Sequence, residues 1–301
     1  MIKNIVLIGN GSHAKKRIIP SLNRKNIKIH RIFSSKNSLK EIAKVKNKKL
    51  FYYICTPPQT HFKIVNFLLL KKQNIIVEKP AILKIDQLKI IKNKILKNKK
   101  NIFIENLMYK HSKIFLKFKN YWKKNKKKII KIEINFLIPN FFKIGFRSKS
   151  EDRFIILHDI GIYPVSLLNI LGINILKIKI KNKLFTKKNL KKIHIHLKSQ
   201  KLEIKINIGE NAKYHNNIIL NQSNGLKIHF DKIFSGTKTN KKIIFTNNKE
   251  KQSSLIKDDD CFVKFFGLNA NYLLSLKKDN LKLLEENILL INRIKSKIKS
   301  N

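Results

Sequence analysis

Cysteine, tryptophan and acidic residues are scarce in this chain of 301 residues, which holds two cysteines, one tryptophan and 18 Asp and Glu. Cys55 and Cys261 lie far apart in the sequence, so they offer neither the spacing of a structural zinc site nor a disulfide framework. His194 and His196 have no acidic or cysteine neighbour that would complete a metal site. We therefore expect a cytoplasmic protein that binds no metal.

Long hydrophobic runs are also missing. The N-terminal sequence MIKNIVLIGNG has an apolar run of only four residues before its first glycine, which is too short for the core of a signal peptide. The longest apolar stretch elsewhere, IVNFLLL at 64–70, falls far short of the roughly 20 residues that a membrane helix needs. We expect no membrane segment.

Positive charge is abundant, with 67 Lys and Arg and a net charge of +49, but only six of these residues are arginines. Recognition of nucleic acids relies on arginine gathered with aromatic residues on one face. Here the lysines are spread along the chain beside Ile and Asn, which share AT-rich codons, and the run at 123–128 reads as a solvated face. We interpret the charge as a composition bias and expect no specific nucleic-acid partner, only weak, salt-sensitive binding to polyanions.

The first third of the chain alternates short β-branched runs with amphipathic, lysine-rich stretches. Such alternation predicts βα units, and therefore a doubly wound parallel sheet with helices on both faces. The helical stretches include 62–72 and 85–96. The predicted strands are NIVLIG, IKIHRIF, LFYYICTPP, NIIVEKP and NIFIEN.

The pattern changes after about residue 120. A strand-like run at 128–139 and a helix at 162–171 precede two predicted antiparallel hairpins, at 191–209 and 216–230, and an amphipathic helix at 281–298 closes the chain. The acidic run at 258–260 reads as a solvated turn. The length suits two domains, and we predict a parallel-sheet domain at 1–120 and a second domain, rich in antiparallel hairpins, at 121–301.

The first strand runs directly into the motif G-x-G-x-x-A. In this motif Gly9 permits a tight turn, Gly11 lets the backbone approach a pyrophosphate, and small Ala14 lets the helix pack on the strand, while Ser12 and His13 begin the helix. We expect these five residues to bind a dinucleotide, although a glycine-rich turn without a ligand is the alternative.

The second strand ends at Ser34, Ser35 and Lys36, where an NAD site would carry an acidic residue for the ribose. Because no carboxylate stands there, and two hydroxyls with a cation suit a 2′-phosphate, we predict NADP(H) in preference to NAD(H). NAD(H) stays possible.

Two further polar segments follow predicted strands: C-T-P-P-Q-T-H at 55–61 and E-K-P at 78–80. Ligands of doubly wound sheets bind at the carboxyl ends of the strands. We therefore count Thr56, Pro57, His61, Glu78 and Lys79 among the predicted cofactor-binding residues.

The order of these motifs, followed by E-N-L-M-Y at 105–109 and H-D-I-G-I-Y-P at 158–164, resembles the glucose-fructose oxidoreductase, inositol dehydrogenase and rhizopine-catabolism family. The resemblance covers the whole chain. It implies a Rossmann domain followed by an α/β domain with an open, mostly antiparallel sheet, NAD(P)-dependent hydride transfer on a sugar or cyclitol, and homodimers or homotetramers formed through that sheet.

The resemblance also implies roles for individual residues. Lys79 of E-K-P matches the family's catalytic lysine, and Asp159 and Tyr163 match its second polar pair. A phenol with a nearby ammonium can protonate the alkoxide that hydride addition creates, so we expect Tyr163 to act as general acid or base, Lys79 to tune it, and Asp159 to orient the substrate or relay the proton.

Within the family, the chain most resembles NDP-hexose 3-ketoreductases, through E-N-L-M-Y-K-H, through N-F-F-K-I-G-F-R ending at Arg147, and through D-I-G-I-Y-P. This resemblance implies a nucleotide-linked sugar as substrate, with Tyr109, Arg147 and His158 as candidate contacts. The chain departs from the pattern at 151–157, where bulky residues replace a glycine-rich run. Two alternatives therefore stay open: a dehydrogenase that uses NAD on free sugars or cyclitols, and a cofactor-binding protein without turnover.

Overall fold

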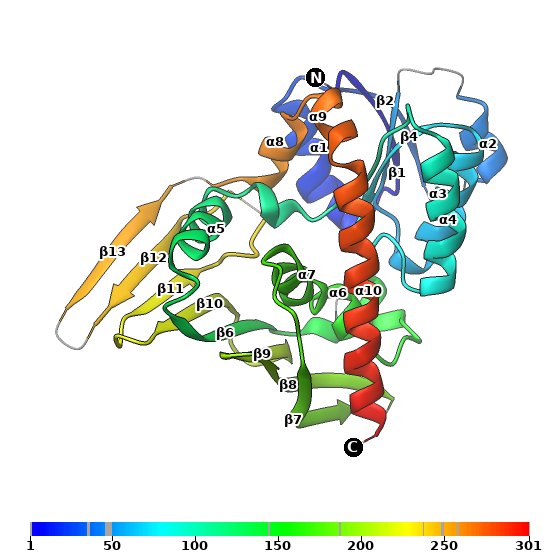
Figure 1. Ribbon diagram of the computed structural model, residues 1–301. Coiled ribbons are helices and arrows are strands. Elements are labelled where there is room, and N and C mark those ends of the chain that lie inside the picture. Colours follow the sequence, from blue (N-terminus) through cyan, green and yellow to red (C-terminus); the bar gives the residue numbers. More distant parts are fainter. Residues whose placement is uncertain are drawn as a thin grey trace. The chain divides into compact units, whose positions relative to one another are not determined.

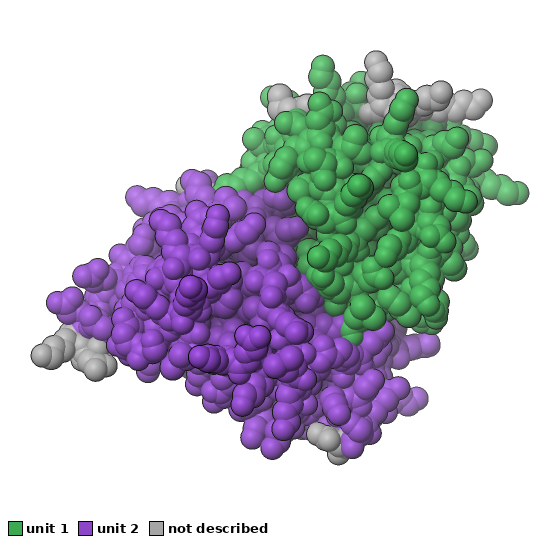
Figure 2. Space-filling model, in the orientation of Figure 1, with its two compact units in different colours: residues 1–108, 262–289 green, residues 109–261, 290–301 purple. Residues whose placement is uncertain are grey.

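The computed structural model describes residues 2–34, 37–45, 50–143, 145–186, 188–236, 238–247, 250–257 and 259–300 (Figure 1). The chain divides into two compact units, which Figure 2 colours green and purple. Unit 1 contains residues 1–108 and 262–289, and unit 2 contains residues 109–261 and 290–301. This division differs from a single boundary near residue 120, because the chain returns to unit 1 after Cys261.

Unit 1 contains a five-stranded sheet in which all neighbouring strands are parallel, in the order β2-β1-β3-β4-β5. The five predicted strands and the parallel sheet are confirmed. The order reverses between β1 and β3, and ligands of such sheets bind outside the carboxyl ends of the strands at this point. The strands are β1 (Asn4–Ile8), β2 (Lys28–Phe33), β3 (Phe51–Ile54), β4 (Asn74–Glu78) and β5 (Phe103–Asn106).

The helices of unit 1 bury apolar stripes against this sheet. Helix α3 (Pro58–Leu70) and helix α4 (Ile85–Lys97) correspond to the two predicted helices. The part of α10 (Lys277–Lys299) that belongs to unit 1 adds Leu281, Leu284 and Ile288 to the same core, which explains why the chain returns. The remaining helical segments are η1 (Ala14–Ile18), α1 (Ile19–Asn23), α2 (Leu39–Ala43), α8 (Cys261–Phe266) and α9 (Ala270–Ser275), with Cys261 itself in unit 2.

Unit 2 contains an eight-stranded mixed sheet in the order β13-β12-β11-β10-β6-β9-β8-β7. Only β6 and β9 pair in parallel, and the other neighbours are antiparallel, which confirms the mostly antiparallel sheet. The predicted hairpins are β8 with β9 and β10 with β11. The strands are β6 (Ile129–Ile138), β7 (Lys177–Thr186), β8 (Asn189–Ser199), β9 (Leu202–Glu210), β10 (His215–Gln222), β11 (Lys227–Asp231), β12 (Lys241–Thr246) and β13 (Lys251–Ile256).

Strand β6 shows that the two faces of the sheet differ in burial. Ile132, Ile134 and Phe136 are buried, whereas the alternating Lys131, Glu133 and Asn135 are partly exposed, as period-2 alternation requires. Helix α6 packs on β8 and β9, and α5 packs on β12. The helical segments of this unit are η2 (Met108–His111), of which Met108 belongs to unit 1, α5 (Lys113–Asn125), η3 (Phe141–Lys143), η4 (Gly145–Lys149), α6 (Ile155–Asp159) and α7 (Ile162–Ile170).

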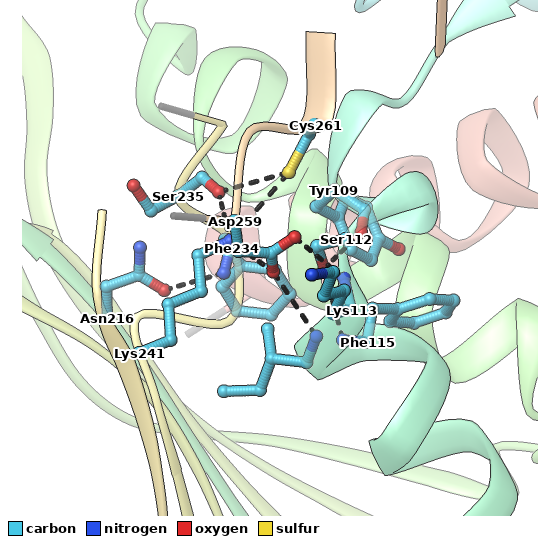
Figure 3. A network of polar contacts seen from close by, with 11 residues as sticks. Tyr109, Ser112, Lys113, Phe115, Asn216, Phe234, Ser235, Lys241, Asp259 and Cys261 are labelled. Atoms are coloured by element: carbon cyan, nitrogen blue, oxygen red, sulfur yellow. Dashed lines mark hydrogen bonds and ion pairs between the residues drawn. The ribbon is translucent and has the colours of Figure 1, made fainter. Parts of the chain in front are cut away.

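A buried ion pair stabilises the start of α5 (Figure 3). Lys241 Nζ lies 3.1 Å from Asp259 Oδ2, and neither side chain is exposed. Asp259 accepts hydrogen bonds from the backbone N–H groups of Lys113 and Ile114, while Lys241 also donates to Ser235 O at 2.8 Å. The prediction of a solvated acidic turn is therefore wrong for Asp259; Asp258 lies outside the described residues.

Among the described residues, no helix combines the length and the apolar character that crossing a bilayer requires.

Candidate active site

The glycine loop after β1 shows two glycines with different constraints. Gly9 has φ +110°, and a Cβ there would lie 2.8 Å from the carbonyl carbon and oxygen of Cys55. Its N–H donates to Phe33 O at 2.8 Å, so the ends of β2 and β3 both lie against it. A Cβ on Gly11 would have no atom within 4 Å. Packing thus requires the first glycine, and the second leaves open space in front of the backbone.

The residues after these glycines fit a bound dinucleotide. Ser12 and His13 are exposed at the start of the helical segment, and Ala14 is completely buried. Open space at Gly11 and a helix that packs closely through Ala14 are what the pyrophosphate of a dinucleotide needs at this position. These residues would hold the phosphates.

At the end of β2, Ser34 makes hydrogen bonds within the loop that follows the strand. Its N–H and Oγ donate to Asn37 Oδ1 at 2.8 and 3.2 Å. The nearest following acid, Glu41, accepts from Ser38 N at 2.6 Å and from Asn37 Nδ2 at 3.2 Å, and these hydrogen bonds, led by that of the Ser38 backbone, lower its pKa. Glu41 is thus engaged in capping α2. Ser35 and Lys36 lie outside the described residues.

The segments that follow β3 and β4 are joined by His61. This side chain is completely buried, with Nδ1 2.9 Å from Pro80 O and Nε2 2.8 Å from Thr56 O. Burial lowers the pKa of the imidazole. Thr56 and Pro57 are further fixed by Thr60 Oγ1, which lies 2.7 Å from Thr56 Oγ1 and donates to Pro57 O at 2.8 Å. His61 thus contacts the backbone on both sides and aligns the two loops.

Glu78 and Lys79 stand at the end of β4. Glu78 is buried and contacts Tyr53, Asn106 and His13, whereas Lys79 is partly exposed. Each of these partners comes from a different strand end or loop of unit 1. The structure thus brings the glycine motif and E-K-P into contact through His13 and Glu78.

The segment after Lys79 is held by β5 and α10. Ala81 N donates to Glu105 Oε1 at 2.7 Å, and Glu105 N donates to Asn280 Oδ1 at 2.9 Å. Sequence reasoning assigned no role to Tyr53, Glu105, Asn106 or Asn280. For Glu105 and Asn106 the signal was present, since both polar residues end a buried strand, but Tyr53 lies within an apolar run and Asn280 lies 175 residues from its partner.

In unit 2 the structure brings Arg147 and Asp159 together. Arg147 Nε donates to Asp159 Oδ2 at 2.5 Å, and its guanidinium carbon lies 4.5 Å from the centre of the Phe141 ring. Asp159 is the last residue of α6 and is buried. The positively charged guanidinium of Arg147, which is able to form two parallel hydrogen bonds, thus lies beside Asp159, the carboxylate predicted to take part in catalysis.

His158, the neighbour of Asp159, pairs with Asp152. Its Nδ1 contacts Asp152 Oδ2, and Asp152 Oδ1 accepts from Phe154 N at 2.9 Å. Within the described part of the chain, His158 Nε2 has no hydrogen-bond partner although it is buried. Desolvation raises the pKa of Asp152, but the hydrogen bond and charge of His158 outweigh it, and the net shift is downward.

The bulky residues at 154–157 lie in the core of unit 2, where Phe154, Ile155, Ile156 and Leu157 are all buried. Gly161 follows them, and a Cβ there would lie 2.7 Å from Leu157 O. The glycine therefore allows α7 to start directly against α6. These bulky residues thus contribute apolar packing to this unit.

Tyr163 and Tyr109 lie in one aromatic cluster. The Tyr163 ring centre is 5.1 Å from that of Phe136 and 5.7 Å from that of Tyr109. Tyr109 is completely buried, and its hydroxyl lies 2.8 Å from Ser166 Oγ, which donates to Tyr163 O. This position gives Tyr109 a packing role next to Tyr163.

In the ranges that the structure describes, no three His, Cys, Asp or Glu side chains gather around a common point that could hold a metal ion.

Comparison with known proteins identifies the class. Residues 3–106 match the model of the oxidoreductase family with an NAD-binding Rossmann fold. The chain is a Rossmann-fold, NAD(P)-binding oxidoreductase. Over residues 3–106, its Rossmann domain is similar to the glucose-fructose oxidoreductase, inositol dehydrogenase and rhizopine-catabolism family, in agreement with the motifs of this part of the chain. A search of the curated proteins finds no match.

Solved structures share the fold over nearly the whole chain. KijD10, a 3-ketoreductase from Actinomadura kijaniata solved with NADP and TDP-benzene, has a TM-score of 0.77 at 13% identity, with 98% of each chain covered. GnnA from Acidithiobacillus ferrooxidans, a UDP-N-acetylglucosamine 3-dehydrogenase, has a TM-score of 0.75 at 10% identity, covering 99% of this chain and 98% of its own. At these identities the likeness is one of fold.

Proposed function

We propose that the protein is an NADP(H)-dependent oxidoreductase that interconverts a carbonyl and a hydroxyl group on a nucleotide-linked sugar. The observation that carries this proposal is the glycine loop, where the open space at Gly11 and the buried Ala14 fit a pyrophosphate. Structural relatives bound to NADP and TDP-benzene, or named for a UDP-sugar, support the choice of substrate class.

The preference for NADP(H) is supported by the end of β2. The carboxylate of Glu41 is engaged by Ser38 and Asn37, so it is not available to a ribose 2′-hydroxyl. Ser34, with Ser35 and Lys36, is proposed to bind the 2′-phosphate. The alternative is an NAD-dependent dehydrogenase of free sugars or cyclitols.

In this proposal a bound nicotinamide supplies or accepts the hydride, and the chain supplies the proton. Tyr163 acts as general acid or base, Lys79 provides positive charge that favours the phenolate, and Asp159, held by Arg147, orients the substrate. Arg147 and His158 are proposed substrate contacts, whereas Tyr109, which is completely buried, packs beside Tyr163. We further propose that the sheet of unit 2 forms a homodimer or homotetramer.

The test begins with a fluorescence titration against NADPH and NADH at about 0.15 M salt, which damps nonspecific charge attraction. Tight binding of NADPH with weaker binding of NADH is expected. Preference for NADH would contradict only the cofactor choice. Binding of neither nucleotide would contradict the proposed function.

Turnover is then measured on a panel of keto and hydroxy sugars, free and nucleotide-linked. Lys79→Ala and Tyr163→Phe are expected to lower kcat by about 100-fold or more, as loss of acid–base catalysis does, while NADPH binding persists. Lys84→Ala, at an exposed lysine nearby in the sequence, is the matched control and should behave as the parent. Cofactor binding without turnover on any sugar of the panel would favour the alternative of a binding protein, which the residues at 151–157 motivate.

A further inference from the structure

The sequence contains the dipeptide Asn-Gly twice, at 10–11 in the loop after β1 and at 224–225 in the turn between β10 and β11. The side-chain amide of an asparagine is open to attack by the backbone nitrogen of the next residue, and a glycine there hinders the attack least because it has no Cβ. Both asparagines are exposed. Exposure therefore does not distinguish the two sites, but their hydrogen bonds do.

In the turn between β10 and β11, both groups that would react are engaged. Gly225 N donates to Gln222 O at 3.1 Å. Leu226 N donates to Asn224 Oδ1 at 3.2 Å. The attacking nitrogen and the amide that it would attack must leave these two hydrogen bonds before they can react, so the hairpin protects this site.

In the loop after β1, the corresponding groups are open. Within the residues that the structure describes, neither the N–H of Gly11 nor the side-chain amide of Asn10 makes a hydrogen bond. The loop is fixed on both sides of this peptide bond. Gly9 N donates to Phe33 O at 2.8 Å, and Gly11 O accepts from Lys15 N at 3.1 Å. A Cβ at Gly11 would have no atom within 4 Å, so there is room beside this residue for a new ring.

We propose that Asn10 and Gly11 form a site of spontaneous deamidation. The nitrogen of Gly11 loses its proton and attacks Cγ of Asn10, the new N–C bond closes a succinimide ring, and the side-chain amide leaves as ammonia. Water then opens either carbonyl of the ring, which leaves aspartate or isoaspartate at position 10. The reaction consumes only water, and it adds one negative charge to the glycine loop.

The modification has a consequence for the cofactor. A carboxylate in this loop repels the pyrophosphate of a dinucleotide, and isoaspartate also lengthens the backbone next to Gly9, where a Cβ would already lie 2.8 Å from the Cys55 backbone. We expect the modified protein to bind NADPH about fivefold more weakly or worse, the effect of one like charge a few ångström from an anion in water. This consequence rests on the proposed function, whereas the modification itself does not.

The modification is tested by incubating the purified protein without nucleotide at mildly alkaline pH. Peptide mapping by mass spectrometry follows the conversion of Asn10 and Asn224 to aspartate and isoaspartate. In the folded protein Asn10 is expected to convert about tenfold faster or more, because two hydrogen bonds hold the other site. In urea the two sites should convert at similar rates. Equal rates in the folded protein, or an intact Asn10 after the unfolded chain has converted, would overturn the proposal.

Two variants connect the modification to cofactor affinity, which fluorescence titration follows during the incubation. Asn10→Ser removes the amide, so its NADPH affinity should not fall with time. Asn224→Ser is the matched control and should lose affinity as the parent does. Asn10→Asp introduces the charge directly and should bind about fivefold more weakly than the fresh parent.

The outcomes separate this inference from the proposed function. If the fresh parent binds neither NADPH nor NADH, the proposed function fails, and the peptide map still decides whether Asn10 is the reactive site. If the fresh parent binds NADPH and conversion of Asn10 leaves the affinity unchanged, the consequence for the cofactor is overturned. Slower conversion of Asn10, but not of Asn224, in the presence of NADPH would support both.

Discussion

At the scale of single residues, Gly9 and Gly11 stand two positions apart but differ in the space around them: a side chain would clash at Gly9 and would meet no atom at Gly11. Gly9→Ala places a methyl group 2.8 Å from the Cys55 backbone at φ +110°, so we expect it to lower the free energy of unfolding by at least about 2 kcal/mol. Gly11→Ala meets no atom within 4 Å and should leave stability within about 0.5 kcal/mol of the parent. Urea denaturation measures both.

The same two variants report on the cofactor. A methyl group at Gly11 enters the space that a pyrophosphate would use, so Gly11→Ala is expected to weaken NADPH binding about tenfold, or about 1.4 kcal/mol. Fluorescence titration of the folded variant checks this expectation. Parent-like affinity in Gly11→Ala would show that the phosphates do not approach this residue.

Asp152 makes stability depend on pH, because the pKa of its carboxyl is lower in the folded protein than its ordinary value of 3.8. Such a group stabilises the fold fully above its ordinary pKa, and this contribution is lost as the pH falls through the lower, folded-state pKa. Asp152→Asn should therefore be less stable than the parent at pH 7, and the difference should narrow below about pH 4. Urea denaturation across the acid range measures the difference, and a constant gap would contradict the assignment.

At the scale of elements, α5 depends on the buried pair of Lys241 and Asp259. Lys241→Met leaves the carboxylate of Asp259 buried without its partner, and we expect a loss of about 3–5 kcal/mol in the free energy of unfolding. Lys131→Met is the matched control, because its partner Glu133 is 30% exposed, and it should cost less than about 1 kcal/mol. Equal losses in urea denaturation would show that burial does not distinguish the two pairs.

The elements themselves differ in how far the sequence predicts them. The five strands of unit 1 are short apolar runs that end in glycine or polar motifs, and both signals are local. Asp259 could not be predicted as buried, because a run of acidic residues carries no information about Lys241, which lies on strand β12. For the same reason the contact between Glu105 and Asn280 is invisible in the sequence. Local patterns predict strands and motifs, whereas partners distant in the chain need the fold.

At the scale of the whole molecule, the division into units also depends on contacts between residues that are distant in the chain, which the sequence does not show. The change of pattern near residue 120 was visible, but the return of residues 262–289 to unit 1 was not. Leu281, Leu284 and Ile288 complete the core of the parallel sheet, yet the amphipathic pattern of α10 indicates only that the helix covers some apolar surface. The sequence predicts the positions of Gly9 and Glu78 at the ends of β1 and β4, because a motif marks the end of each strand, whereas their role in cofactor binding stays a proposal.

The net charge of +49 is a property of the whole molecule. Its effect depends on salt, and this dependence distinguishes nonspecific binding of DNA from specific binding of NADPH. Lysines spread over the surface bind duplex DNA by releasing counterions, so raising salt from about 50 to 200 mM should weaken this binding by about 1,000-fold or more. NADPH carries few charges and is expected to bind through defined contacts, so its affinity should change far less. Anisotropy of a labelled duplex and NADPH fluorescence measure the two in parallel. Sequence-dependent duplex binding that persists at the higher salt would instead indicate a dedicated nucleic-acid surface.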